Sequence, residues 1–149
     1  MPHQIDKSAL VMHSAERMFA LVNDVERYPE FLPWCADAEV HHHGDSELTA
    51  SLEVARSGVR HRLTTRNELL PPRSINMVLV DGPFQNLRGR WEFQPLDDTA
   101  CKVMFRLEFE FSGALARMTF GPVFGHAANT MVDAFCRRAD EVYRARGLV

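Results

Sequence analysis

Histidine, serine, aspartate and cysteine all occur in this sequence of 149 residues, but their spacing forms no catalytic signature that we can identify. A G-x-S-x-G nucleophile elbow is missing from the sequence. Asp81 lies in a turn motif, where aspartate is favoured for structural reasons. His126 and Asp133 fall on the surface of a predicted helix. The sequence therefore favours a protein that binds over one that catalyses, and we expect no enzyme activity.

Three consecutive histidines, His41 to His43, are the segment that most suggests a metal site. In a strand, His41 and His43 point to one face and His42 points to the other. No cluster of cysteines or carboxylates is identifiable nearby to complete a ligand set. We interpret the three histidines as a solvent-exposed run near a turn and expect no metal.

The three cysteines, Cys35, Cys101 and Cys136, are widely spaced, odd in number and form no C-x-x-C pair. Reduced thiols in the cytoplasm fit this pattern better than a disulfide framework. The sequence has no run of 18 apolar residues, and no apolar stretch follows a basic N-terminus. We therefore expect a soluble cytoplasmic protein, with contact at the inner membrane surface as an alternative.

The charge balance limits which partners the chain can have. It carries 17 basic and 20 acidic residues and a formal net charge of −3, which argues against a surface built wholly for nucleic acid, and we expect no DNA binding. A local basic face is still expected, because arginines recur on one side of the predicted strands. This face solubilises the sheet, or it contacts RNA phosphates or anionic lipids; no aromatic platform for sequence-specific RNA binding accompanies it. Its members are Arg60, Arg62, Arg66, Arg88 and Arg90, with Lys102 and Arg106 beside them.

Most of the chain shows the two-residue period of antiparallel strands that have one buried face. Turn signals such as Asp81-Gly82-Pro83-Phe84 and Asp97-Asp98-Thr99 separate the strands. The clearest alternation is over 101–111, where Cys101, Val103, Phe105, Leu107, Phe109 and Phe111 share one face. A first strand is expected over 3–12, and the other alternating segments are 48–55, 59–69, 75–79 and 87–94.

Two short helical segments are expected after the first strand. Ser14 can cap a helix whose apolar face is Ala15, Met18, Phe19 and Val22. Asp24 can cap a second, shorter helical turn that Pro29 and Pro33 would end. The proline-rich and aromatic segment 28–35 that follows is expected to pack down on the core.

The C-terminal region is expected to divide at Gly121-Pro122 into a short helix over 112–120 and a long helix over 122–146. Gly147 would lie just past the end, with Arg144 and Arg146 near the negative end of the helix dipole. A 25-residue helix spans about 37 Å, and a twelve-residue strand spans about 40 Å. The long helix is thus the right length to cover the sheet. Its apolar face is Phe124, Ala128, Met131, Phe135, Ala139 and Val142.

The inner face of the sheet carries large aromatic side chains, while the facing helix offers several alanines. Either the small residues let helix and sheet approach closely, or a groove is left that accepts a ligand. His61, Thr65 and Asn67 are polar on this inward face and favour the second alternative, because buried polar groups need partners. The segments 28–34 and 113–124, the latter with Leu115 and Met118, are gates over the pocket mouth or simple lids.

Several segments resemble one known family. They are Tyr28-Pro29-Glu30-Phe31-Leu32-Pro33-Trp34-Cys35, Asp81-Gly82-Pro83-Phe84 followed by Trp91-Glu92-Phe93, and Phe109-Glu110-Phe111 followed by Met131-Val132-Asp133-Ala134-Phe135. Together they resemble the START-like family that contains coenzyme Q-binding proteins of respiration and the bacterial ribosome association toxin RatA, within the polyketide cyclase/dehydrase-like superfamily. The resemblance covers nearly the whole chain in order.

The resemblance implies one α+β domain over 1–149 with the helix-grip fold, in which a seven-stranded antiparallel sheet wraps around a long C-terminal helix. It implies binding of ubiquinone or a similar lipid in support of respiratory electron transfer, with no required cofactor. The alternative it implies is a toxin of a toxin–antitoxin pair that binds the large (50S) ribosomal subunit and blocks subunit association. The expected ligand-binding residues are Phe31, Trp34, His61, Thr65, Met77, Leu79, Trp91, Phe93, Phe105, Phe109, Phe120, Phe124, Ala128 and Met131.

Overall fold

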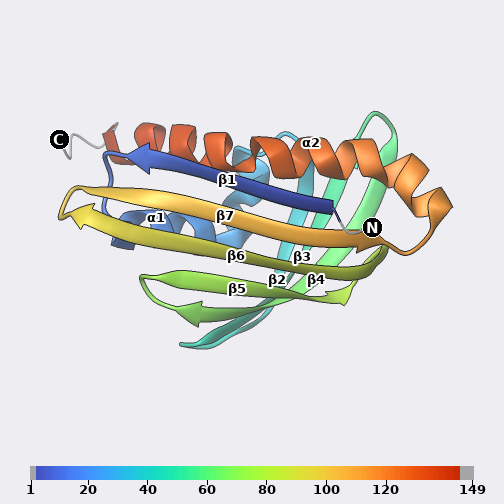
Figure 1. The fold of residues 1–149 in the computed structure, drawn as a ribbon, viewed down its shortest axis with the longest axis horizontal. Helices are drawn as coiled ribbons and strands as arrows, with labels where there is room; N and C mark the ends of the chain where they lie inside the picture. Colours follow the sequence, from blue (N-terminus) through green and yellow to red (C-terminus); the bar gives the residue numbers. More distant parts are fainter. Residues whose placement is uncertain (1–2, 145–149) are drawn as a thin grey trace.

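The structure, a computed structural model, describes residues 3–144 and consists of seven strands and two principal helices (Figure 1). The N-terminal half contains β1 (His3–Val11), α1 (Ala15–Asn23), the 3-10 helix η1 (Val25–Glu30), β2 (Cys35–His43), β3 (Glu47–Arg56) and β4 (Val59–Leu70). The C-terminal half contains β5 (Ser74–Asp81), β6 (Phe84–Asp97), β7 (Ala100–Phe111), α2 (Ala114–Ala139) and the π-helical turn η2 (Asp140–Arg144). The seven-stranded antiparallel sheet and the long C-terminal helix expected from the sequence are confirmed.

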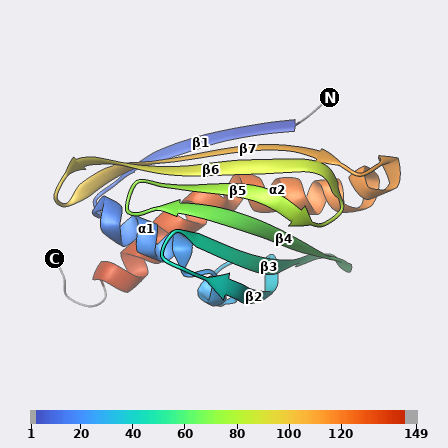
Figure 2. The same cartoon turned by 90° about the horizontal axis from the view of Figure 1, so that it is seen from below.

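The strands form one antiparallel sheet in the order β1-β7-β6-β5-β4-β3-β2. Strands β2 to β7 follow one another as a meander. The first strand, β1, forms the edge of the sheet beside β7, and Ile5 lies opposite Leu107 in this pair. The helix α2 runs along the concave side of this curved sheet, with α1 beside it (Figures 1 and 2). An open sheet with one apolar face has to be covered, and α2 covers it.

Alternation along the strands explains which face is buried. In β7 every second side chain from Cys101 to Phe111 is buried, and those between are partly or fully exposed. In β6 the expected positions Leu87, Gly89, Trp91 and Phe93 are buried, and so is Phe84 at the start of the strand. Gly89 leaves room at this face for the methyl group of Met77, because a Cβ at position 89 would lie only 2.6 Å from Met77 Cε.

The first helix begins as expected. The side chain of Ser14 accepts a hydrogen bond from the backbone N–H of Arg17 at 3.1 Å, and Ala15, Met18, Phe19 and Val22 are buried. The expected capping role of Asp24 is wrong: its side chain makes no capping hydrogen bond. The carboxylate instead forms an ion pair with Arg27 at 3.1 Å.

Two further expectations about helix boundaries are corrected. Pro29 does not end η1 but lies inside it. The division at Gly121-Pro122 is also wrong, since α2 continues through Pro122 from Ala114 to Ala139. Proline deprives the carbonyl of Met118 of its donor, but Met118 is exposed and water can bind that carbonyl. Buried Phe120 and Phe124 anchor the helix on both sides of the proline.

The end of α2 also differs from expectation. The helix gives way to η2 after Ala139, short of the predicted 122–146 range. Arg144 belongs to η2, while Arg146 and Gly147 lie outside the described residues. The predicted apolar face is otherwise observed: Phe124, Ala128, Phe135 and Ala139 are buried, with Met131 and Val142 half-buried.

The turn η2 is tied to the start of the chain by several contacts. His13, which is 4% exposed, has Nε2 at 2.7 Å from Asp140 Oδ1. The hydroxyl of Tyr143 donates to the carbonyl of Arg17 at 2.8 Å, and the Arg17 guanidinium lies over the Tyr143 ring. Among the described residues, no helix combines the length and apolar character needed to cross a bilayer.

Candidate functional site

An apolar cavity of about 80 Å³ lies between the concave face of the sheet and α2. Strands β3 to β7 form its walls, η1 and Trp34 cover one side, and α2 forms the opposite wall. Its lining residues are Val25, Tyr28, Trp34, Ala50, Leu52, Val54, Leu63, Thr65, Asn67, Met77, Leu87, Trp91, Phe105, Leu107, Phe124, Ala127, Ala128 and Met131.

The structure brings together eight of the fourteen residues that the sequence suggested for ligand binding. Those that line the cavity are Trp34, Thr65, Met77, Trp91, Phe105, Phe124, Ala128 and Met131. Those that lie outside its lining are Phe31, His61, Leu79, Phe93, Phe109 and Phe120. Sequence reasoning favoured large aromatic side chains and passed over smaller lining residues such as Ala50, Leu52 and Ala127, although their alternation in β3 and spacing in α2 were visible.

Ring packing explains why Phe109, Phe120 and His61 do not line the cavity. Phe109 and Phe120 belong to a cluster at the end of the sheet, with ring centroids 4.9 Å apart between Phe109 and Phe124 and 5.9 Å apart between Phe84 and Phe120. The ring of His61 packs on Phe120 at 4.7 Å. Edge-to-face rings pack this end with protein atoms, and the cavity lies next to the cluster, with Phe124 belonging to both.

Four polar side chains border the otherwise apolar cavity. The hydroxyl of Thr65 donates to Oδ1 of Asn67 at 3.0 Å, and the hydroxyl of Tyr28 donates to the carbonyl of Val22. The indole Nε1 of Trp34 is buried without a hydrogen-bond partner. Burial raises the pKa of Tyr28 far above its usual value, so this phenol stays protonated. The described lining contains no histidine, cysteine, carboxylate or lysine and offers no general base at neutral pH.

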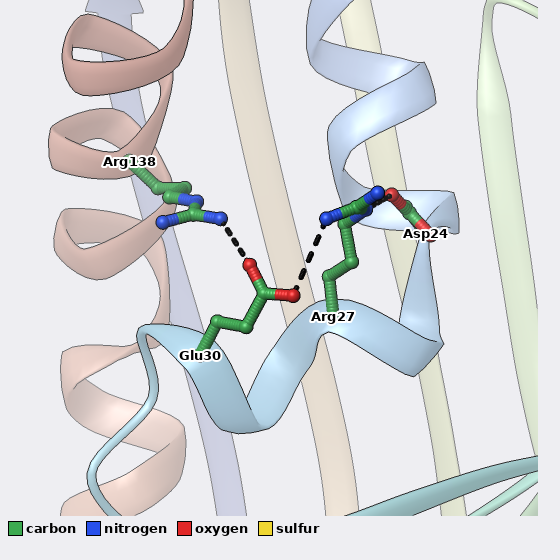
Figure 3. A network of polar contacts seen from close by, with 4 residues as sticks. All are labelled: Asp24, Arg27, Glu30 and Arg138. Carbon is green, nitrogen blue, oxygen red and sulfur yellow. Dashed lines mark hydrogen bonds and ion pairs between the residues drawn. The ribbon is translucent and has the colours of Figure 1, made fainter.

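The segment 28–35 packs down on α2 at one side of the cavity. The rings of Tyr28 and Phe31 each lie 5.2 Å from Phe135, and the Arg138 guanidinium lies over Phe31 at 5.0 Å. Figure 3 shows the ion pairs that fix this arrangement, in which Glu30 binds Arg138 at 2.7 Å and Arg27 at 3.3 Å. The segment therefore forms a closed lid in this structure.

The expected arginine face is exposed but largely ion-paired. Arg60 binds Glu53 at 3.3 Å and Arg62 binds Glu39 at 2.9 Å. Two more basic residues are paired in the same way, Arg90 with Glu92 at 2.8 Å and Arg106 with Asp6 at 3.4 Å.

Arg66 and Arg88 differ from their neighbours, because neither forms an ion pair within residues 3–144. They flank Val78 on three adjacent strands, since Val78 is the cross-strand partner of both. Glu108 lies opposite Arg88 on the next strand. This surface is therefore mixed in charge, with two unpaired guanidinium groups beside an exposed apolar residue.

The three histidines are exposed, as expected, and His41 is linked to the sheet. Its Nε2 lies 2.7 Å from the hydroxyl of buried Ser51, which in turn lies 2.6 Å from the hydroxyl of Thr64.

Cys35 and Cys101 are buried, and burial raises the pKa of each thiol to about 11. Cys136 is partly exposed, with a pKa that burial also raises.

Comparison with known proteins identifies the family. A profile described as "Polyketide cyclase / dehydrase and lipid transport" matches residues 11–136, which is most of the chain. The chain belongs to this family. The resemblance inferred from the sequence is thereby confirmed.

The similar curated relatives include proteins named as toxins and a protein named for coenzyme Q binding. The "Ribosome association toxin RatA" of Vibrio cholerae is 52% identical over 94% of this chain and 97% of its own length. The RatA of Escherichia coli K12 is 48% identical over 96% of this chain and 90% of its own length. A more distant relative, the mitochondrial "Coenzyme Q-binding protein COQ10" of Drosophila melanogaster, is 28% identical over 92% of this chain and 55% of its own length.

Solved structures of other proteins share the fold. The Zhui aromatase/cyclase from Streptomyces sp. R1128 superposes with a TM-score of 0.86, covering 99% of both chains at 20% identity. An 18 kDa protein of Caulobacter crescentus superposes with a TM-score of 0.73 at 29% identity, covering 95% of this chain and 98% of its own. The helix-grip fold is thus confirmed, while identity of 20% to a cyclase says nothing about activity.

Proposed function

We propose that this chain associates with the ribosome and, through the large subunit, hinders the joining of the two ribosomal subunits. The observation that carries the proposal is the 52% identity, over almost the full length of both chains, to a protein named for ribosome association. The apolar lining without a general base supports action by binding instead of catalysis. This role belongs in the cytoplasm, where ribosomes are.

The outer face of the sheet supplies a candidate contact for ribosomal RNA. Arg66 and Arg88 are exposed and have no carboxylate bound to them within residues 3–144, so they can approach phosphates without first breaking an ion pair. Arg60, Arg62 and Arg90 are already paired and contribute less to such an approach. Exposed Val78 between the two free arginines adds apolar area to the contact.

The test is expression of this chain in Escherichia coli followed by sedimentation of ribosomes through a sucrose gradient. The wild-type chain should lower the share of joined ribosomes and raise that of free subunits. The double variant Arg66→Glu/Arg88→Glu should lose this effect. The charge-matched control Arg60→Glu/Arg62→Glu, on the same face, should keep most of it if circular dichroism shows that both variants fold.

The possible results test ribosome association separately from the assignment of Arg66 and Arg88 as the contact. An unchanged gradient on expression of the wild-type chain overturns the ribosome proposal. If the control double variant loses the effect as completely as the test variant, the assignment of Arg66 and Arg88 is wrong while ribosome association stands.

We propose as a second function that the cavity binds a hydrophobic ligand of the ubiquinone class. Three observations favour it: an apolar cavity lies between sheet and helix, the description of the family includes lipid transport, and a relative at 28% identity is named for coenzyme Q binding. The cavity of about 80 Å³ is smaller than the roughly 300–1,000 Å³ of drug-sized ligand pockets. Binding therefore requires side chains to move apart.

Native mass spectrometry of gently purified protein, followed by solvent extraction, tests the second function. A bound quinone or lipid is the expected result. Ala128 lines the cavity from α2, so Ala128→Leu should reduce binding of added quinone more than it reduces the free energy of unfolding. An empty wild-type protein that also fails to bind added quinone would rule this function out.

A further inference from the structure

Two nitrogen donors on the cavity lining lack partners. Asn67 is only 6% exposed and its Oδ1 is occupied by the Thr65 hydroxyl, but its Nδ2 forms no hydrogen bond within residues 3–144. The Asn67 amide nitrogen keeps some accessible surface although the residue as a whole is buried, whereas the indole Nε1 of Trp34, on the same lining, is fully buried and unpaired. Buried polar groups normally find a partner, and each exception calls for an explanation.

The direction of the existing hydrogen bonds shows what kind of partner is missing. The hydroxyl hydrogens of Thr65 and Tyr28 are both used, one on Asn67 and the other on the carbonyl of Val22. The spare hydrogens on the lining therefore come from Asn67 and Trp34. A matching ligand has to supply an acceptor oxygen, and the apolar walls around these donors require the rest of it to be apolar.

We propose that the cavity selects a flat, apolar ring compound carrying a carbonyl oxygen, which accepts a hydrogen bond from Asn67 Nδ2. The proposal rests on the second proposed function and adds to it the chemical feature of the ligand that is recognised. Thr65 is a positioning residue, because its hydroxyl holds the amide oxygen of Asn67 and so turns the amide nitrogen away from Thr65.

Room for the ring comes from two methionines. A dry cavity of about 150 Å³ is known to hold benzene, so the space of about 80 Å³ must roughly double. Met77 and Met131 line the cavity from opposite walls and are half-buried. Methionine has three rotatable bonds and adapts to irregular spaces, so these two side chains can turn outward without moving the backbone.

The test compares duroquinone with durene, which have the same ring and methyl groups but differ in the carbonyl oxygens. Both tryptophans of the chain, Trp34 and Trp91, line the cavity, so quenching of intrinsic fluorescence reports duroquinone directly and durene by competition. Asn67→Leu should weaken duroquinone binding about three- to tenfold, the worth of one neutral hydrogen bond. Durene binding should stay the same or tighten.

Asn86→Leu is the matched control, because Asn86 is exposed on the outer side of β6. It should leave both affinities unchanged. A second measurement needs no variant: in ¹⁵N-labelled wild-type protein, the side-chain amide signals of Asn67 should shift with duroquinone and much less with durene. Because this measurement uses wild-type protein, it still tests the proposal if Asn67→Leu fails to fold.

The outcomes are distinguishable. Equal affinity of wild-type protein for duroquinone and durene, together with unmoved Asn67 amide signals, overturns this proposal and leaves apolar-ligand binding intact. Failure of the wild-type protein to bind either compound overturns the second proposed function itself, and this proposal with it.

Discussion

The imidazole of His13 and the carboxylate of Asp140 meet at 2.7 Å, although 127 residues separate them in the sequence. His13 follows β1 and Asp140 begins η2, so this contact joins the start of the described chain to its end. The carboxylate is half exposed, while the imidazole is almost completely buried. Breaking the contact from the Asp140 side therefore leaves a buried polar group without its partner.

We expect Asp140→Ala to lower the free energy of unfolding by about 1–3 kcal/mol, the cost of leaving a buried polar group unsatisfied. Urea denaturation monitored by circular dichroism measures this directly. Arg144→Ala is the control, because Arg144 has its closest approach to Asp140 at 3.6 Å and is exposed; it should cost less than about 0.5 kcal/mol. Equal losses in the two variants would contradict the importance of the buried imidazole.

A second prediction concerns the ion pair between Glu30 and Arg138 that holds the lid on α2 (Figure 3). Glu30 is about half exposed and Arg138 is mostly buried, so solvent weakens the pair without cancelling it. A double-mutant cycle with Glu30→Gln and Arg138→Gln should give a coupling free energy of about 0.5–1 kcal/mol in urea denaturation. A coupling of zero would mean that the ring contacts of Phe31 alone hold the lid.

The next prediction compares alanine substitutions at two glycines, Gly89 and Gly125, which should change the free energy of unfolding in opposite directions. Alanine at position 89 would place its Cβ 2.6 Å from Met77 Cε and 3.0 Å from Leu107 Cδ1. We expect Gly89→Ala to cost about 1 kcal/mol through overpacking and to push Met77 toward the cavity, reducing quinone affinity. Thermal and urea denaturation measure the first effect and fluorescence titration the second.

Gly125→Ala supplies the comparison. Gly125 lies inside α2, and a Cβ there would meet nothing within 4 Å. This variant should stabilise the protein by about 0.5–1 kcal/mol, because alanine is the better helix former. A change of stability in the same direction for both variants would contradict the steric conflict between a Cβ at position 89 and Met77.

The buried thiols predict a pH dependence. Burial raises the pKa of Cys35 and Cys101 to about 11, from an ordinary value of about 9 for a thiol. Since the unfolded chain loses these protons first, the stability they contribute is complete below about pH 9 and falls as the pH rises toward 11. The free energy of unfolding should therefore drop between these pH values, and less so in Cys35→Ala/Cys101→Ala.

The same thiols should resist alkylation. At pH 8 the thiolate fraction of a group with a pKa of about 11 is roughly one in a thousand. Iodoacetamide followed by mass spectrometry should modify the partly exposed Cys136 before Cys35 or Cys101. Faster modification of either buried cysteine would show that the segment near it opens.

Much of the fold was predictable because side-chain alternation fixes which face of each strand is buried. The face of β7 from Cys101 to Phe111 and the face of α1 from Ala15 to Val22 were both identified from spacing alone. The continuity of α2 was not, because Pro122 is a strong local stop signal. Buried Phe120 and Phe124 override it through contacts with Phe84, which lies far away in the sequence.

The candidate site was harder to predict for a related reason. Whether an aromatic residue lines a cavity or fills a cluster depends on its neighbours across the sheet, as with Phe105 in the lining and Phe109 beside Phe124. The ion pairs of the arginines also depend on strand register: Arg62 binds Glu39 of β2, two strands away, although Glu53 is its direct partner in β3. Neither relationship is encoded in local sequence.

The order of the strands has a consequence for biosynthesis. Because β1 lies at the edge of the sheet and pairs with β7, it has no partner strand during synthesis until about a hundred further residues have been made. The helix that covers the aromatic concave face is made later still. Until then the nascent chain exposes the surface around Trp91 and Phe105, which is the kind of surface that chaperones bind and that drives aggregation. A chain that stalls in translation before residue 114 should therefore be a ready client for chaperones and proteases.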